Sequence, residues 1–354
     1  MLQDLDRKVA EFIAGKNILI TGAAGTVGTA LTRRLLAFKP KVIRLLDHNE
    51  EDTFFLGITF GNNPNVRPLL GDIRDRERMK RAIQDVDVVF HAAALKHVSV
   101  GEYNPFEVVR TNLVALQDLI ECCIDANVQK FIFTSSDKAV NPTNVMGGSK
   151  FIGERLVTAG NVYRGRARTV FVSTRFGNVL GSAGSVVPLF RRQIAEGGPV
   201  TVTDSSMTRF VMSELQAVDL ILSALVAGWG GEVFVPKMQA LRLQDLASGM
   251  IDLLAGGRPV KTVEIGLRPG EKAYEDLISA EEIPRCLETE RLLIVLPFAE
   301  ESLYEVGGRH ASKLGPPDYP DNPAWVRQVY SSRTTTPLSK AGVLELLRTD
   351  VLRA

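Results

Sequence analysis

The sequence predicts a doubly wound α/β fold, in which helices cover both faces of a parallel sheet, followed by a smaller C-terminal substrate-binding domain. Two observations carry this prediction. The first half of the chain alternates short β-rich runs with helical periodicity, and a glycine-rich turn follows the first run. After about residue 178 the alternation loosens into loops and helices. We therefore expect a main domain over residues 1–178 and a mainly separate domain over residues 179–354, with some segments returning to the first.

Six runs rich in β-branched and aromatic residues predict the strands of the main domain. They are NILIT (17–21), VIRLLD (42–47), VRPLLGD (66–72), VDVVFHA (86–92), KFIFTSS (130–136) and TVFVSTRF (169–176). Apolar residues with helical spacing predict helices over 26–38, 76–84, 105–125 and 149–157. The last stretch of about forty residues is rich in proline, serine and threonine, which predicts an irregular strap with a final helix over 338–347.

Charge, cysteine content and hydropathy exclude several classes of protein. The 354 residues include 42 basic and 41 acidic side chains, so the net charge of +1 gives no field that would attract nucleic acid. The three cysteines lack the spacing of metal ligands or of a disulfide framework, which favours buried thiols, no metal and a reducing compartment. No apolar run reaches the roughly 18 to 20 residues that cross a bilayer, and the N-terminus does not resemble a signal peptide. We expect a soluble cytoplasmic protein.

The strand-to-helix turn TGAAGTVG predicts a dinucleotide-binding loop of the Rossmann type. Gly22, Gly25 and Gly28 let the turn close tightly and let backbone N–H groups approach a pyrophosphate at the helix N-terminus. Packing of a tight turn is the alternative reason for small residues there. We expect further cofactor contacts from residues of this loop and of the neighbouring strand ends: Ala24, Thr26, Val27, His48, Ile73, Ala92 and Ala93.

Two carboxylates at strand ends bear on the choice of cofactor. Asp47 ends the second predicted strand, where a carboxylate accepts both adenosine-ribose hydroxyls and repels a 2′-phosphate, so NAD is favoured over NADP. The alternative is that Asp47 caps the next helix. Asp72 follows the third strand and either meets the adenine amino group or caps the following helix.

Seven segments occur in the order seen in extended short-chain dehydrogenases/reductases. They are TGAAGTVG, HAAALKHV (91–98), SSDKAVNPTNVMGGSK (135–150), RFGNVLGS (175–182), MTRFVM (207–212), VFVPK (233–237) and GLRPGEK (266–272). Over about residues 15 to 280 the chain resembles the UDP-N-acetylglucosamine 4,6-dehydratases of the polysaccharide-biosynthesis branch. Larger relatives carry a membrane-embedded N-terminal half, and this sequence resembles the short, soluble form.

The resemblance implies a three-step redox cycle on one bound NAD. Hydride leaves C4 of the sugar, water is eliminated across C5 and C6, and the hydride returns to C6. Carried over to this sequence, Asp137 is the acid that protonates the departing 6-hydroxyl and Lys138 the base at C5. These roles require a raised carboxyl pKa and a lowered lysine pKa, hence partial burial. A surface Asp–Lys pair in a turn is the alternative.

Lys150 and Ser136 are the other candidate catalytic residues. Lys150 matches the lysine of the usual YxxxK pair and is expected to hold the nicotinamide ribose; the alternative is a solvated helix lysine. Ser136 is expected to hydrogen-bond O4 of the sugar, unless its hydroxyl satisfies the end of the strand.

Met146 stands where the family usually has the catalytic tyrosine, four residues before Lys150. A thioether cannot transfer a proton, so we expect Met146 to pack, against either the core or the ligand. Some members of this branch carry methionine here. Another group must then accept the proton of the C4 hydroxyl. The candidates are a water molecule that relays the proton to Ser136 or Lys150, and Asp137 acting a second time.

Substrate contacts are expected mainly from the second half of the chain. Arg209 and Arg268 suit a pyrophosphate because a guanidinium binds it bidentately. The other candidates are Asn178 for sugar or phosphate, Glu271 for the ribose hydroxyls, and Lys96 near the nicotinamide. Each of these side chains could instead be solvated or paired on the surface.

The sequence thus predicts an NAD-dependent UDP-N-acetylglucosamine 4,6-dehydratase that serves surface glycan synthesis. The rival functions are a nucleotide-sugar 4-epimerase, a GDP-linked dehydratase, and a non-catalytic NAD-binding scaffold. The resemblance also implies a homo-oligomer, a dimer or a larger assembly such as a hexamer, with contacts through the helix over 105–126 and the helix that starts at Met146.

Overall fold

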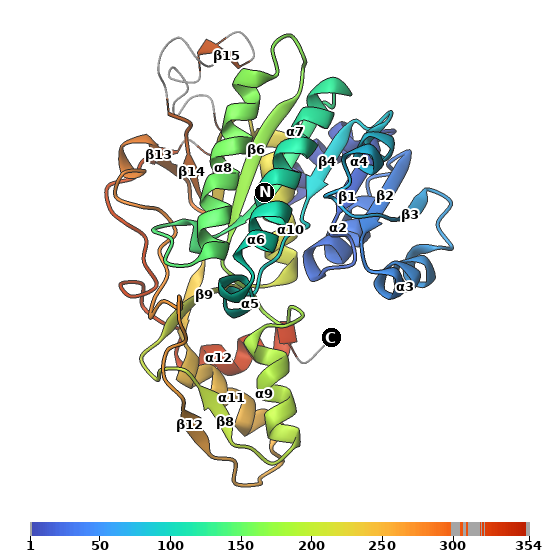
Figure 1. Cartoon of the computed structure of the whole chain (residues 1–354). Helices are drawn as coiled ribbons and strands as arrows, with labels where there is room; N and C mark the ends of the chain where they lie inside the picture. Colours follow the sequence, from blue (N-terminus) through green and yellow to red (C-terminus); the bar gives the residue numbers. More distant parts are fainter. Residues whose placement is uncertain are drawn as a thin grey trace.

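A long twisted sheet forms the centre of the larger lobe in the computed structural model, which describes residues 2–298, 305–306, 309–310, 319, 321 and 323–351 (Figure 1). Seven strands run parallel, in the spatial order β3-β2-β1-β4-β5-β6-β10. They are β1 (Asn17–Thr21), β2 (Val42–Asp47), β3 (Val66–Leu70), β4 (Val88–His91), β5 (Lys130–Ser136), β6 (Val170–Phe176) and β10 (Val233–Pro236). The six strands predicted from sequence are confirmed, with ends that differ by at most two residues.

Segments of the second half of the chain extend this sheet, with short strands that the sequence did not predict individually. After β10, the strands β14 (Leu292–Val295), β13 (Cys286–Glu288) and β17 (Ala324–Trp325) add to the edge, each antiparallel to the strand before it. The buried β10 has the continuous apolar pattern expected of a strand covered on both faces.

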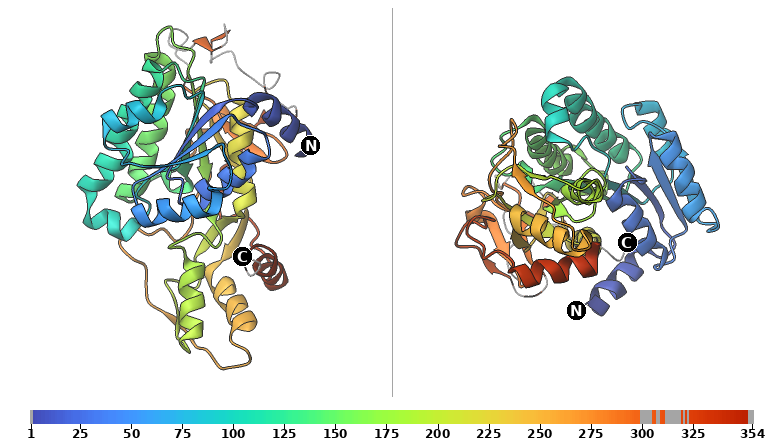
Figure 2. Two further views of the ribbon diagram at one scale, coloured as in Figure 1. Left: turned by 90° about the vertical axis from the view of Figure 1, so that its right-hand side faces the viewer. Right: turned by 90° about the horizontal axis from the view of Figure 1, so that it is seen from below.

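Helices cover both faces of the sheet, so the predicted doubly wound fold is confirmed (Figure 2). One face packs against α1 (Leu2–Ile13), α2 (Thr26–Leu36) and α10 (Glu214–Ala227). The other packs against α4 (Arg76–Ile83), α7 (Ala115–Asp125) and α8 (Val145–Tyr163). The predicted helix over 105–125 exists as α6 (Pro105–Val109) and α7 joined by a π-helical turn over 110–114. The helices α3 (Glu50–Phe60) and α5 (Val98–Tyr103) follow β2 and β4.

A smaller lobe lies below the carboxyl ends of the parallel strands in Figure 1. It contains α9 (Val186–Ala195), α11 (Leu243–Leu254), α12 (Lys340–Leu346) and the two-stranded sheet of β8 (Val200–Val202) and β12 (Thr262–Glu264), around a hydrophobic core of its own. Between the lobes lies a sheet of β7 (Asn178–Val179), β9 (Thr208–Met212) and β11 (Gln239–Arg242). The pair β15 (Glu305–Val306) and β16 (Arg309–His310) lies apart from these sheets.

None of the helices in the described residues combines the length and the apolar character that crossing a membrane requires. The predicted final helix over 338–347 is confirmed as α12, and much of the preceding strap is irregular where the structure describes it. Part of that strap lies outside the described residues.

Candidate active site

The glycine-rich turn between β1 and α2 packs against the segment after β4. Gly22 has a φ of +66°, and a Cβ at this position would lie 2.6 Å from the backbone nitrogen of Ala93. A Cβ at Gly28 would lie 2.5 Å from the carbonyl oxygen of Gly22. Only glycine fits at these two positions. Gly25, the N-cap residue of α2, makes no side-chain cap, so this helix terminus suits an anion such as a pyrophosphate.

Asp47 joins the end of β2 to the glycine-rich turn. Its carboxylate accepts hydrogen bonds from the backbone N–H of Ala24 (3.1 Å) and of His48 (2.8 Å). The interpretation of Asp47 as a helix cap is wrong, because Asn49 caps α3 by accepting from the N–H of Asp52. The carboxylate therefore lies beside the turn, which suits the predicted contact with a ribose.

Asp72 is not a helix cap either. Asp75 caps α4 by accepting from the N–H of Arg78, whereas the carboxylate of Asp72 forms an ion pair with Arg74. The side-chain hydrogen bond from Arg74 lowers the pKa of Asp72. The adjacent Ile73 is buried, and the predicted contact of Asp72 with adenine stays a prediction.

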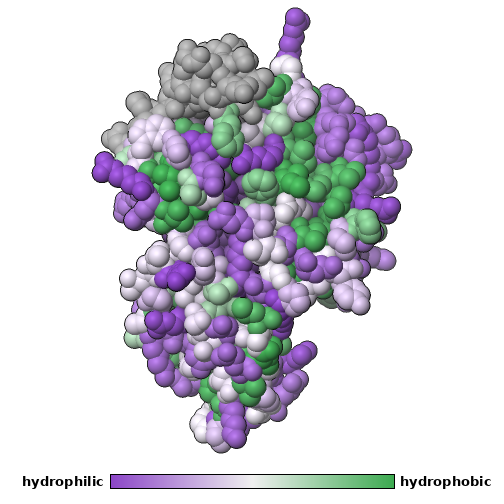
Figure 3. All heavy atoms as spheres, turned by 60° about the vertical axis from the view of Figure 1, so that its left-hand side comes forward, coloured by the Kyte–Doolittle hydropathy of each residue, from purple (hydrophilic) through white to green (hydrophobic). Residues whose placement is uncertain are grey.

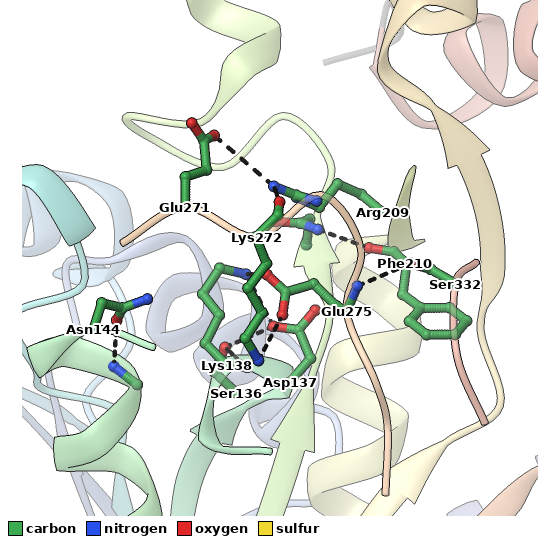
Figure 4. A network of polar contacts seen from close by, with 12 residues as sticks. Ser136, Asp137, Lys138, Asn144, Arg209, Phe210, Glu271, Lys272, Glu275 and Ser332 are labelled. Carbon is green, nitrogen blue, oxygen red and sulfur yellow. Dashed lines mark hydrogen bonds and ion pairs between the residues drawn. The ribbon is translucent and has the colours of Figure 1, made fainter. Parts of the chain in front are cut away.

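The segment after β5 places Asp137 and Lys138 where the two lobes meet (Figure 4). Asp137 is fully buried, and its Oδ1 accepts hydrogen bonds from the hydroxyl of Ser136 and from Nζ of Lys138, each at 2.9 Å. Its Oδ2 has no hydrogen-bond partner among the described residues. The side chain of Lys138 is 19% exposed. The alternative of a solvated surface pair is therefore wrong.

Sequence reasoning missed Glu275, the second carboxylate beside Lys138. The side chain of Glu275 is 2% exposed, and its Oε1 lies 3.6 Å from Nζ of Lys138. On its other side, Nζ of Lys272 lies 3.5 Å from Oε2. Glu275 follows the GLRPGEK segment by only three residues, so its proximity to that motif was the available signal.

The charge state of Lys138 differs from the expectation for a base. Burial alone would lower the pKa of Lys138, but the negative charges of Asp137 and Glu275 outweigh that effect and raise it. The predicted lowering is therefore wrong for the protein without substrate. Burial raises the pKa of Glu275, against the opposing attraction of Lys138.

Ser136 has a structural role in addition to any role in catalysis. Its hydroxyl oxygen accepts from the N–H of Lys138 and caps the short turn after β5, while its proton is donated to Asp137. The alternative that this hydroxyl satisfies the end of the strand is thus correct for the protein without ligand. A contact between Ser136 and O4 of the sugar stays a prediction.

Lys150 and Met146 lie on the buried side of α8. Nζ of Lys150 donates to the carbonyl of Thr134 (2.8 Å) and lies 4.7 Å from the ring centroid of Phe133. Burial lowers the pKa of Lys150 to about 8, so it is not a solvated helix lysine. Met146 is 4% exposed, which confirms that it packs.

The π-helical turn before α7 supplies a contact that sequence reasoning also missed. The buried Asn112 donates to the carbonyl of Leu95, accepts from the N–H of Leu95 and donates to the hydroxyl of Ser149. It thereby ties the loop after β4 to α8, directly beside Lys150.

The predicted substrate residues gather around two loops at the boundary between the lobes. Arg209 donates to the carbonyls of Thr208 and Lys272, and its Nη2 lies 3.9 Å from Glu271. Asn178 donates to the carbonyl of Phe210. Two candidates lie further out. Lys96 is exposed and donates to the carbonyl of Ala183, and Arg268 is exposed, with its backbone N–H bonded to Glu271.

The loop over 266–272 is docked on the segment that follows Lys138. The side chains of Thr143 and Asn144 both donate to the carbonyl of Gly270, at 3.1 and 2.9 Å, and Lys272 donates to the carbonyl of Val140. These contacts bring the two most distinctive motifs of the sequence together.

Fold and site together define a dinucleotide-binding α/β protein of the extended short-chain dehydrogenase/reductase type. The chain belongs to the family described as polysaccharide biosynthesis protein, whose model matches residues 18–297. With its relatives it falls among the nucleotide-sugar dehydratases and epimerases.

Three relatives illustrate the range of this family. An uncharacterized membrane protein of Methanocaldococcus jannaschii is 44% identical over 98% of this chain and 98% of its own length. A UDP-N-acetylglucosamine 4,6-dehydratase (inverting) of Campylobacter jejuni is 40% identical over 80% of this chain and 83% of its own. A UDP-glucose 4-epimerase of Rickettsia massiliae is 40% identical over 76% of this chain and 80% of its own length.

Two solved structures share the fold. Pen from Bacillus thuringiensis is 39% identical, with a TM-score of 0.86 over 96% of this chain and 99% of its own. DesIV, a dTDP-glucose 4,6-dehydratase from Streptomyces venezuelae, was solved with NAD bound. It is 22% identical, with a TM-score of 0.66 over 76% of this chain and 90% of its own.

Proposed function

We propose that this protein is an NAD-dependent UDP-N-acetylglucosamine 4,6-dehydratase, which forms a 4-keto-6-deoxy sugar nucleotide for surface glycan synthesis. The observation that carries the proposal is the pair of the fully buried Asp137 and the partly buried Lys138 at the carboxyl end of β5, where parallel α/β sheets bind their ligands. A lysine beside a carboxylate supplies the base and the acid that an elimination needs. The similarity to the Campylobacter jejuni dehydratase supports the choice of reaction.

The residues around the glycine-rich turn fit NAD. Gly22 and Gly28 leave the space that backbone contact with a pyrophosphate needs, and Asp47 places a carboxylate beside the turn for the ribose. Bound NAD would accept the hydride from C4 and return it to C6. Lys150 lies beside Thr134 on the side of the sheet that faces α8, where it would hold the nicotinamide ribose.

The Asp137–Lys138 pair balances its protons over one elimination. In the protein without substrate, Lys138 and Asp137 form an ion pair. Transfer of one proton over the 2.9 Å hydrogen bond gives a neutral lysine and a neutral carboxylic acid. Lys138 then takes the proton from C5, and Asp137 gives its proton to the departing 6-hydroxyl. The ion pair is restored when water leaves. Its ammonium group would then protonate C5 as hydride returns to C6, and the proton released earlier from the C4 hydroxyl would replace it.

Lys150 is the group that we assign to the proton of the C4 hydroxyl, by way of a water molecule. Met146 has no proton to exchange, and the hydroxyl of Ser136 is already bonded to Asp137. Because burial brings the pKa of Lys150 to about 8, its amine form becomes available near neutral pH.

A nucleotide-sugar 4-epimerase is the second candidate, because the Rickettsia massiliae epimerase is as similar to this chain as the dehydratase is. It would need the redox step at C4 but no acid–base pair at C5 and C6. Incubation with UDP-N-acetylglucosamine, followed by mass spectrometry, separates the two functions. Loss of the mass of one water supports the dehydratase; an unchanged mass with a new stereoisomer supports the epimerase and overturns the proposal.

We also propose that the protein forms a homo-oligomer through α5, α6 and α8. Exposed apolar side chains gather on these adjacent helices, and Figure 3 shows hydrophobic residues over the larger lobe, above a hydrophilic band where the lobes meet. The exposed apolar side chains on α5, α6 and α8 are those of Val100, Tyr103, Phe106, Val109, Phe151 and Ile152. A surface of this kind is typical of a subunit contact.

A further inference from the structure

Glu275 has the contacts of a residue that acts on Lys138, which the proposed function does not explain. Its carboxylate is buried between two ammonium groups, at 3.6 Å from Nζ of Lys138 and 3.5 Å from Nζ of Lys272. Its Oε2 has no hydrogen-bond partner among the described residues. A buried carboxylate without hydrogen bonds is costly, so its retention here calls for an explanation.

The backbone of Glu275 is fixed by the C-terminal strap. Its N–H donates to the hydroxyl of Ser332, which is itself fully buried and lies 2.9 Å from the hydroxyl of Thr208. The N–H of Ser332 donates back to the carbonyl of Glu275, and the N–H of Leu277 donates to the carbonyl of Tyr330. The strap therefore holds Glu275 in place from both sides (Figure 4).

In the proposed elimination, a second carboxylate beside Lys138 has a role that Asp137 cannot fill. Asp137 becomes a neutral acid when it takes the proton of Lys138, and from that moment it no longer attracts an ammonium ion. Among the described residues, Glu275 is the other carboxylate within 4 Å of Nζ. It can hold the side chain in position and stabilise the ammonium ion that forms when Lys138 takes the proton from C5.

We propose that Glu275 is a positioning residue that fixes Nζ of Lys138 and keeps on Lys138 the proton that this side chain passes to Asp137. This inference rests on the proposed function for its catalytic consequence. The charges that face the pair are those of Asp137 and Arg209 around Lys138, and of Asp137, Arg209 and Lys272 around Glu275. In this setting, loss of the Glu275 charge favours the neutral amine of Lys138.

The test is a direct titration of Lys138 by NMR in protein labelled with ¹³C at the lysine ε-carbon, with Lys138→Met assigning the signal. In Glu275→Gln, the midpoint of the Lys138 titration should move to lower pH by about one unit or more, a tenfold change in the acid dissociation constant. Asp276→Asn is the matched control, because it removes the neighbouring carboxylate, which has no described contact with Lys138, and should leave the midpoint unchanged.

Glu275→Asp keeps the charge and should retain most of the raised midpoint, which covers the case in which the glutamine variant does not fold. An unchanged midpoint in Glu275→Gln, or an equal movement in Asp276→Asn, would overturn the inference. Since this titration needs no turnover, its outcome is separate from the outcome of the dehydratase assay. If the wild type is active, the alkaline limb of its pH profile for dehydration, where Lys138 loses to solvent the proton that Asp137 must donate, should move to lower pH in Glu275→Gln as well.

Discussion

Two neighbouring side chains, Asp137 and Lys138, carry the chemistry that we propose, and their surroundings explain why they are an ion pair at rest. Asp137 is fully buried and Lys138 is 19% exposed, so Asp137 depends on its ion pair with Lys138 in place of contact with water. A pair that exchanges one proton internally provides an acid and a base together, without a proton from solvent. This arrangement does not require a phenol at position 146.

Replacing Met146 tests whether the thioether has only a packing role. Met146→Leu conserves volume in a buried position, so activity should fall by less than about tenfold, or about 1.4 kcal/mol on the barrier. Steady-state kinetics with UDP-N-acetylglucosamine measure this, with circular dichroism to verify folding. A loss of more than about a thousandfold in a folded variant would show that the sulfur takes part directly.

At the residue level, the sequence identified the groups inside its motifs and missed the long-range ones. Asp137, Lys138 and Lys150 stand in one segment, so the motif identified all three as candidates. The direction of the Lys138 pKa could not be predicted, because it depends on Glu275, which is distant in the chain and reaches the site through the fold.

The buried Arg175 links three elements of the larger lobe. It forms ion pairs with Glu154 of α8 and Glu282, each at 2.8 Å, and donates to the carbonyl of Leu277. Arg175→Met leaves two buried carboxylates without their partner, so the free energy of unfolding should fall by about 3 to 5 kcal/mol. Lys340→Met removes the exposed pair with Asp252 and should cost less than about 1 kcal/mol.

The same cluster gives a pH dependence with a definite sign. Although burial opposes it, Arg175 lowers the pKa of Glu282 to about 2 from the ordinary 4.5, so this pair contributes stability above pH 4.5 that is lost as the pH falls toward 2. The stability difference between wild type and Arg175→Met should therefore shrink over this range. Urea unfolding followed by fluorescence checks it, and a difference that grows toward acid pH would contradict the assignment.

The loop over 266–272 can be tested with a matched pair of glycine variants. Gly270 and Gly266 have similar φ angles, +77° and +80°, but only at Gly270 would a Cβ meet a neighbour, Cβ of Asn144 at 2.9 Å. Gly270→Ala should displace the loop and raise KM for the UDP-sugar about tenfold or more above that of Gly266→Ala, with NAD affinity unchanged. Equal KM values in the two variants would show that docking of this loop does not matter.

Elements of the first half could be predicted because each strand and helix carries its own periodicity. Strands β13, β14 and β17 were missed because they are short and are stabilised by pairing with one another at the sheet edge. Helix α10 was missed because it is apolar on most sides, as a helix between the sheet and α1 must be.

At the scale of the whole molecule, the proposed acid–base pair and the loop over 266–272 meet at the boundary between the two lobes. The chain crosses that boundary several times, and the C-terminal strap returns to fix Glu275. Site and fold are therefore stabilised by the same contacts.

The proposed subunit contact predicts a change of assembly on a single substitution. Phe106 is 80% exposed on α6, so Phe106→Glu should dissociate the oligomer by placing a charge in an apolar interface. Leu215→Glu, at an exposed position of α10, is the control and should leave the assembly intact. Analytical ultracentrifugation measures both; a monomeric wild type, or an unchanged assembly in Phe106→Glu, would contradict the proposal.

The measurement that tests the central claim most directly is the fate of the C5 proton in D₂O. The wild type should give dehydrated product with deuterium at C5. Lys138→Met should still bind UDP-N-acetylglucosamine and reduce bound NAD, because hydride transfer from C4 precedes the step that needs the base. Its dehydration should fall by about 10² to 10⁴, and recovered substrate should keep its C5 proton. Lys150→Met should give neither reduced nicotinamide nor product. Dehydration by Lys138→Met at nearly the wild-type rate, or free exchange of its C5 proton, would show that Lys138 is not the base.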